Sequence, residues 1–292
     1  MRKIPIAGLG VLLLSAAHAD TGDLKHPDWH PDGHLLVSEG SCAGNIGLYL
    51  IDTGTGDIRL LFDSEHVDGY PRWFPDGKRI AFHQINDTGV SRLHIAELSE
   101  AGTVLETTNV TDGGFDIEPA PSPDGATLAY STSGQGGQDI ALLDLKTGEV
   151  TVWETDYPEN FPSWRPDGTA VLFHARQSGD VQIYGRTLPS SQATRVSVGP
   201  GPNIVGHMSA DATLLFFSSE RDGDREIYVQ QLNNDVVTRL TNRSGRDGYP
   251  KISPSGTQLA YHSEIDEEQT VVTLLNLESG ERKRFACSDY SN

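Results

Sequence analysis

The residues best suited to chemistry form two sets that recur at regular spacing. The first set is acidic, and each acid lies three residues before a proline: Asp68, Asp116, Glu159 and Asp247. Carboxylates that converge on one place raise one another's pKa and attract cations. Asp and Asn ahead of proline also cap local turns. A binding role and a turn role therefore both remain open for these acids.

The second set pairs histidine with an aromatic residue. The histidines lie eight residues after a turn proline, at His83, His174 and His262. Counting back across each predicted hairpin places them opposite Tyr70, Phe161 and Tyr249. A shared metal ion needs ligand nitrogens at about 2 Å, whereas strand spacing predicts histidines about 17 Å apart. Cross-strand packing pairs are the favoured interpretation, and contact with a ligand at a channel mouth is the alternative.

Six copies of one repeat carry both sets. Pro-Asp-Gly begins at Pro31, Pro75, Pro123 and Pro166, with weakened copies at Ala210 and Pro254, at spacings of 44, 48, 43, 44 and 44 residues. In the second copy, extended stretches at 68–74, 79–83, 92–95 and 104–108 are separated by turn-forming residues. Four short strands per repeat at this period are typical of a β-propeller. The sequence predicts an all-β, six-bladed propeller with four-stranded antiparallel blades over residues 24–286, within a single domain of residues 20–292. The blades open near Pro27, Pro71, Pro119, Pro162, Gly206 and Pro250.

The first strand of each predicted blade lines the central channel, so residues just before it should converge at one mouth. A concave site with a few convergent polar groups is the default binding hypothesis. We therefore expect a binding site formed by the four acids, with Tyr70, Phe161 and Tyr249 as apolar faces and Arg72, His207 and Lys251 just inside the channel.

The repeat resembles the TolB-type (WD-like) propeller family. Residues 71–77 read Pro-Arg-Trp-Phe-Pro-Asp-Gly, and residues 219–229 contain Arg-Asp-Gly followed by Ile-Tyr-Val. This resemblance covers residues 24–286 and implies a propeller without the separate N-terminal domain of TolB. The predicted partner is an envelope protein, a peptide or a glycan.

Catalytic motifs are absent from the sequence. It contains no Gly-x-Ser-x-Gly, His-Glu-x-x-His or phosphate-binding glycine loop. We therefore expect a binding module without catalysis or cofactor. The alternative comes from a resemblance to oligogalacturonate lyases, which hold a metal with histidines and a glutamine. In this alternative the protein is a carbohydrate-active enzyme that binds a divalent cation. The metal ligands would be His83, Gln84, His174 and His262.

Residues 1–19 read as a secretory signal peptide. A basic start at Arg2 and Lys3 precedes a short apolar run, and Ala17-His18-Ala19 fits cleavage after Ala19. The apolar run is too short to span a bilayer, so we expect a periplasmic or secreted monomer without membrane insertion. The net charge of −19 disfavours nucleic acid and anionic lipid.

The two cysteines, Cys42 and Cys287, both lie in the predicted exported part. An even number of cysteines in an oxidising compartment favours a disulfide. Cys42 falls between two strands of the first blade, and Cys287 follows the last strand of the sixth. Both positions fall on one face of the ring in neighbouring blades, so we predict a bond that closes the ring.

Overall fold

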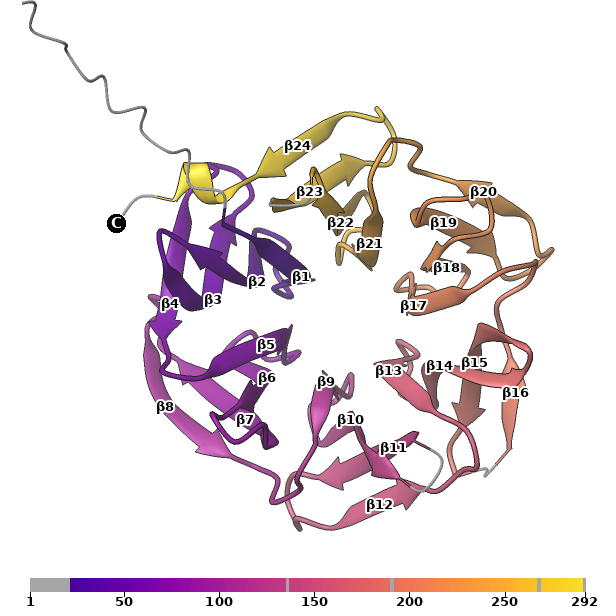
Figure 1. The fold of residues 1–292 in the computed structure, drawn as a ribbon, viewed down its shortest axis with the longest axis horizontal. Coiled ribbons are helices and arrows are strands. Elements are labelled where there is room, and N and C mark those ends of the chain that lie inside the picture. The colour runs from indigo at the N-terminus through magenta and orange to yellow at the C-terminus, as the bar shows by residue number, and fades with distance from the viewer. Residues whose placement is uncertain (1–21, 135–136, 190–191, 267–268, 291–292) are drawn as a thin grey trace, which may run out of the picture.

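The computed structural model describes residues 22–290 apart from 135–136, 190–191 and 267–268. The predicted signal peptide, residues 1–19, lies outside this part. The described residues form six four-stranded antiparallel sheets arranged as a ring (Figure 1), so the predicted six-bladed propeller is confirmed. The single 3-10 turn Cys287–Asp289 is the helical element found in these residues. None of their helices is long and apolar enough to cross a membrane.

The strands follow one another blade by blade. Blades one to three contain β1 Leu24–Trp29, β2 Leu35–Cys42, β3 Asn45–Asp52, β4 Ile58–Asp63, β5 Val67–Trp73, β6 Arg79–Ile85, β7 Ser91–Leu98, β8 Val104–Asn109, β9 Ile117–Pro121, β10 Thr127–Gly134, β11 Gly137–Asp144 and β12 Val150–Trp153. Blades four to six contain β13 Glu159–Trp164, β14 Ala170–Ser178, β15 Asp180–Thr187, β16 Ala193–Arg195, β17 Asn203–Met208, β18 Leu214–Ser219, β19 Glu226–Gln231, β20 Val237–Arg239, β21 Asp247–Ile252, β22 Gln258–Glu264, β23 Thr270–Asn276 and β24 Arg282–Phe285. Strand order within each sheet follows the chain, and the first strand is innermost (Figure 1).

The Pro-Asp-Gly turn connects the first two strands of a blade. In blade two, the Phe74 carbonyl accepts a hydrogen bond from the Gly77 amide at 3.1 Å. Asp76 Oδ1 accepts from the amides of Lys78 at 2.8 Å and Arg79 at 3.1 Å. Gly77 has φ of 66°, a conformation that glycine adopts without steric cost. These bonds fix where the inner strand ends in each repeat.

Every inner strand carries an irregularity at the same place. One residue has a positive φ of 51–57° in each blade: His26, Tyr70, Glu118, Phe161, Val205 and Tyr249. In blade two, for example, the pairing of β5 with β6 shifts register between Gly69 and Arg72. A β-bulge re-aims side chains. The six bulges thus set one layer of side chains around the axis.

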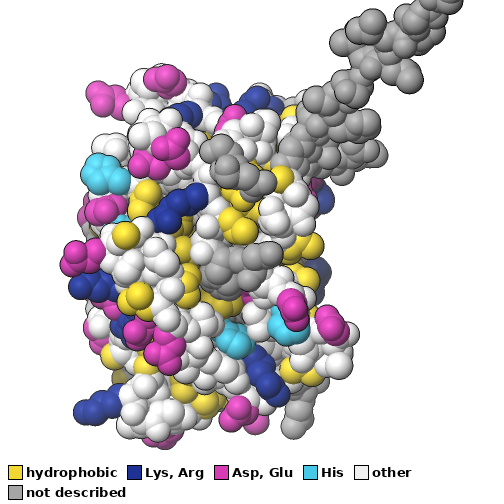
Figure 2. Space-filling model, turned by 90° about the vertical axis from the view of Figure 1, so that its left-hand side faces the viewer, with side chains coloured by type: hydrophobic (Ala, Val, Ile, Leu, Met, Phe, Trp, Pro, Cys, Tyr) yellow, Lys and Arg dark blue, Asp and Glu magenta, His cyan; other side chains and the backbone are white. Residues whose placement is uncertain are grey.

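The hydrophobic core lies between neighbouring blades. Val37 and Leu50 of blade one pack with Trp73, Ile80 and Phe82 of blade two, and all five are buried. Equivalent clusters join the other blades, for instance blades five and six. On the side of the ring shown in Figure 2, acidic and basic side chains lie scattered among apolar and neutral groups. Burial between blades holds each inner strand in place around the axis.

Blades one and six meet without sharing a strand among the described residues. The predicted disulfide between Cys42 and Cys287 joins them and is confirmed. The Thr270 amide donates to Asp23 Oδ1 at 2.8 Å, and Lys283 Nζ donates to the Thr53 carbonyl at 2.9 Å. The ring is therefore closed by the disulfide, by these hydrogen bonds and by a backbone bridge between Ile58 of blade one and Tyr290.

Candidate functional site

An aromatic plug closes the channel at the level of the bulges. We use this name for His26, Tyr70, Phe161 and Tyr249, which come from four different blades. The His26 ring stacks on Tyr70 with centroids 4.0 Å apart and meets Tyr249 edge-on at 4.2 Å. Phe161 lies 5.6 Å from Tyr70 and 5.5 Å from Tyr249. Rings at these separations leave no open passage along the axis.

A half-buried carboxylate orients the plug. Glu39 Oε1 lies 2.8 Å from His26 Nδ1, and Glu39 Oε2 accepts a hydrogen bond from the Tyr70 amide at 2.6 Å. Burial raises the pKa of Glu39, but His26 and the Tyr70 amide outweigh that effect and lower it to about 2. Glu39 is therefore an ionised anchor that holds two rings of the plug.

The floor layer lies two residues further along each inner strand. Its members are Asp28, Arg72, Ala120, Ser163, His207 and Lys251, one from each blade. Lys251 Nζ lies 3.5 Å from Asp28 Oδ1. Arg72 donates to the Pro71 carbonyl at 2.9 Å. Only 8% of the Arg72 surface and 7% of the Lys251 surface are exposed.

Burial sets the charge of this layer. Burial and the neighbouring Arg72 lower the pKa of Lys251 to about 8. Burial, with the nearby cations Lys251 and Arg72, holds the pKa of His207 well below its ordinary value, so His207 is neutral at pH 7. Burial also raises the pKa of Glu118, in the bulge layer above, to about 7. The floor layer therefore carries two cations and one carboxylate around neutral pH.

A cavity of about 440 Å³ extends from the floor layer to the Pro-Asp-Gly turns. Its walls come from the next position of each inner strand: Trp29, Trp73, Pro121, Trp164, Met208 and Ile252. Its rim comes from the turns: Pro31, Pro75, Pro123, Pro166, Ala210 and Pro254. The volume lies in the range typical of small-molecule sites. Because the plug lies beyond the floor, the cavity is open at one end only.

The four predicted acids lie away from this cavity, at the other end of the inner strands. They are at most 3% exposed. Asp68 accepts from Gln84 Nε2 at 2.9 Å, and Asp116 accepts from Thr132 Oγ1 at 2.6 Å. Both carboxylates thus bond side chains of the neighbouring strand. Neither the binding role nor the turn-capping role is decided by these contacts, and both stay predictions.

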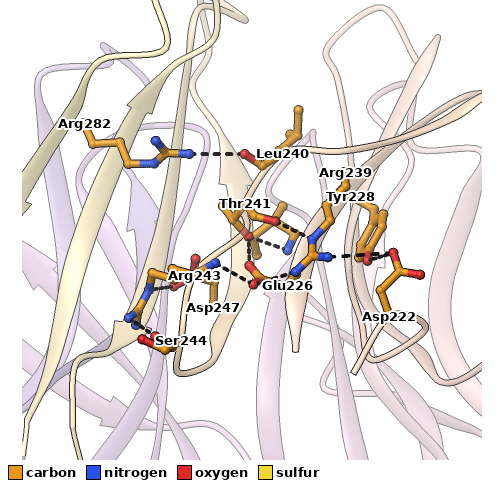
Figure 3. A network of polar contacts seen from close by, with 11 residues as sticks. Asp222, Glu226, Tyr228, Arg239, Leu240, Thr241, Arg243, Ser244, Asp247 and Arg282 are labelled. Carbon is orange, nitrogen blue, oxygen red and sulfur yellow. Dashed lines mark hydrogen bonds and ion pairs between the residues drawn. The ribbon is translucent and has the colours of Figure 1, made fainter. Parts of the chain in front are cut away.

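The other two acids pair with arginines. Glu159 Oε1 lies 3.2 Å from Arg186 Nη2. Burial raises the pKa of Glu159 to about 7, although the Arg186 guanidinium opposes the rise. Asp247 accepts from Arg243 Nε at 2.8 Å, in a network between blades five and six centred on Glu226 (Figure 3). The carboxylates of Glu159 and Asp247 are thus partnered by arginines within the fold.

The predicted histidine–aromatic pairs are present. Ring centroids are 5.2 Å apart for His83 and Tyr70, 4.8 Å for His174 and Phe161, and 4.7 Å for His262 and Tyr249. The bulge moves the strand register by one, so that His83 pairs with Gly69. Gln84 binds Asp68 instead of joining the histidines. Within the described ranges, no three His, Cys, Asp or Glu residues are placed to hold a metal ion, and the metal-dependent lyase stays an untested alternative.

The comparison with protein families agrees with this geometry. The model of the TolB beta propeller domain matches residues 111–292, more than half of the chain. The chain belongs to the TolB β-propeller family.

Relatives of this TolB-type propeller include a peptidase and a Tol-Pal system protein. It is 28% identical over 143 residues to dipeptidyl-peptidase 5 of Porphyromonas gingivalis, covering 44% of this chain and 20% of the relative. It is 22% identical over 177 residues to the Tol-Pal system protein TolB of Francisella tularensis subsp. holarctica, covering 59% and 40%. The chain thus spans less than half of either relative. The crystal structure of TolB from Acinetobacter baumannii superposes with a TM-score of 0.70 at 21% identity, over 90% of this chain and 63% of the other, which shows the shared fold.

The structure separates the residues that sequence reasoning had grouped at one mouth. Tyr70, Phe161 and Tyr249 belong to the plug, while Arg72, His207 and Lys251 line the cavity on its other side. Sequence reasoning missed His26, Glu118 and Asp28. The repeat could have identified them, because His26 and Glu118 occupy the repeat position of Tyr70 and Asp28 occupies that of Arg72.

Proposed function

We propose that the protein is an exported, non-catalytic binding module that captures a peptide, or a peptide segment of an envelope protein, in the central cavity. The cavity carries this proposal. It is concave, walled by three tryptophans, and has its charged groups at its floor, and an apolar lining with a few convergent polar groups is the usual composition of a ligand site. The disulfide supports export, because such bonds persist in oxidising compartments. A partner in a Tol-Pal-type system is the first to test, since one relative bears that name.

Peptide capture fits the lining better than glycan capture. Proline and tryptophan side chains form most of the wall and rim, and aromatic surfaces bury much apolar area per side chain. The hydroxyls of Ser122, Ser163 and Ser253 are the small polar groups among the lining residues. Apolar peptide side chains would therefore find more complementary surface there than sugar hydroxyls.

The test uses a rim variant that blocks entry. Ala210 is an exposed rim residue, so Ala210→Trp places a large ring at the opening. Ala126 is exposed and follows the blade-three turn outside the lining, so Ala126→Trp is the matched control. Affinity selection from a random heptapeptide library should recover peptides with the wild type and the control but not with Ala210→Trp. Equal recovery with Ala210→Trp would locate binding elsewhere.

A further inference from the structure

We propose that the cavity recognises the free carboxylate at the C-terminal end of a peptide, which Arg72 and Lys251 bind at the floor layer. This inference rests on the proposed function and deepens it by naming the chemical group of the peptide that the cavity binds. Three observations carry it: the cationic floor, the closed inner end of the cavity and the apolar walls.

The cations are the unexpected feature of the floor layer. The chain as a whole carries a net charge of −19, yet two basic side chains converge on the axis and are more than nine-tenths buried. Among the described residues, no carboxylate lies within 4.0 Å of the Arg72 guanidinium, which donates a hydrogen bond to the Pro71 carbonyl. Burying a cation without a partner costs free energy. An anionic ligand would supply that partner.

The floor does not neutralise itself. Asp28 is its carboxylate, and it is divided between Lys251 at 3.5 Å and the Trp73 amide, which donates to Asp28 Oδ2 at 2.9 Å. Glu118 is directed to other donors, since it accepts from Ser131 Oγ at 2.8 Å and from the Phe161 amide at 2.9 Å. A void of about 10 Å³ separates this plug level from the floor, which is the lower limit for one water molecule.

The closed end decides how a ligand enters. Because the plug blocks the channel behind the floor, a peptide reaches Arg72 and Lys251 with one of its ends. The C-terminal end bears a carboxylate, whereas the N-terminal end bears an ammonium group that the two cations repel. Arg binds a carboxylate through two parallel N–H···O bonds. The tryptophans around the floor would then contact the last side chains of the peptide.

The experiment compares acid and amide ends of the same probes. An equimolar mixture of N-acetylated tripeptides of Ala, Pro, Leu and Phe is prepared as free acids and as C-terminal amides, and retained species are quantified by mass spectrometry. We expect the free acids to be favoured at least about tenfold, since hydrogen bonds to charged groups are the strong class. The preference should weaken as salt is raised.

Variants assign the effect to the floor. Arg72→Met and Lys251→Met should each reduce the acid preference several-fold, while Asp28→Asn should increase it by removing the competing carboxylate. Lys146→Met changes an exposed lysine outside the cavity and serves as the control. Arg72→Met should melt no lower than the wild type, because it removes an unpaired buried charge. If it unfolds, Asp28→Asn and Lys251→Met still decide the matter.

The outcomes separate the two proposals. Acids and amides retained equally, with both lost in Ala210→Trp, would overturn carboxylate recognition and leave peptide capture standing. Retention of neither form would overturn both. Binding of oligogalacturonate in the same assay, with no peptide retained, would also overturn the inference and assign the cationic floor to an acidic glycan.

Discussion

Glu118 is the residue whose chemistry depends most on its place in the ring. It occupies the bulge position that holds an aromatic or histidine ring in four other blades, so its carboxylate is enclosed with them. Burial raises its pKa to about 7, although Ser131, the Phe161 amide and Arg72 oppose the rise. It therefore changes charge around neutral pH, one layer above the two cations of the floor.

This shift predicts a specific pH dependence of stability. The ordinary pKa is 4.5 and the folded value is about 7, so between these values the folded state holds a proton that the unfolded state has lost. Stability from this group is present below pH 4.5 and is lost as pH rises through about 7. Glu118→Gln, which keeps an acceptor oxygen, should remove that loss. Its effect on the free energy of unfolding should therefore be about 3 kcal/mol more stabilising at pH 8 than at pH 4.

Urea unfolding at pH 4 and pH 8 measures the difference between wild type and variant. Glu106→Gln changes an exposed acid on β8 and should leave the pH dependence as it is. A Glu118→Gln effect of the same size at both pH values would show that the pKa of Glu118 is the same in the folded and the unfolded protein.

The blade is the scale at which sequence and structure agree best. Pro, Asp and Gly each have a distinct turn function, so the turn and the two flanking strands could be predicted locally. The bulges could not, because a residue before proline is biased toward extended conformations. Five of the six positive-φ residues nevertheless precede proline. The bulges also place Arg72, His207 and Lys251 on the other side of the plug from the four acids, a separation that local sequence patterns do not reveal.

The turn of blade five has alanine at the position that is glycine in the other five blades. Ala212 occupies the position of the turn glycine and has φ of 55°, a conformation that costs residues with a Cβ about 1–2 kcal/mol. Ala212→Gly should therefore stabilise the protein by about 1 kcal/mol, which raises the melting temperature by roughly 2–4 °C.

Calorimetry checks this change against Ala126→Gly. Ala126 is exposed and is not among the positive-φ residues, so its replacement should lower the melting temperature slightly. If Ala212→Gly is also destabilising, the methyl group of Ala212 contributes more through its contact with the blade-five core than the backbone strain costs.

The whole ring depends on how its first and last blades are joined. Cys42 and Cys287 are 245 residues apart in sequence, so their bond restricts nearly the entire unfolded chain. The connection could be predicted from the repeat number, because six repeats make blades one and six neighbours. The location of the cavity could not, because it depends on side-chain sizes contributed by all six blades at once.

Replacing both cysteines with serine should lower stability substantially while preserving the fold. Chain entropy assigns a loop of this length about 5–6 kcal/mol, and the hydrophobic clusters between the other blades remain. Far-ultraviolet circular dichroism should be unchanged and the melting temperature lower. A variant with unaltered stability would mean that the contacts of Asp23 and Lys283 suffice to close the ring.

The floor layer has a consequence for how such proteins diversify. Its six residues lie 44, 48, 43, 44 and 44 positions apart in the chain, yet they surround one point on the axis. Each can be exchanged by a single codon change without altering a turn or a strand. Relatives with the same scaffold can therefore differ in ligand while their repeat motifs remain similar. Comparing the six floor-layer positions between relatives would reveal a change in specificity that overall sequence identity does not show.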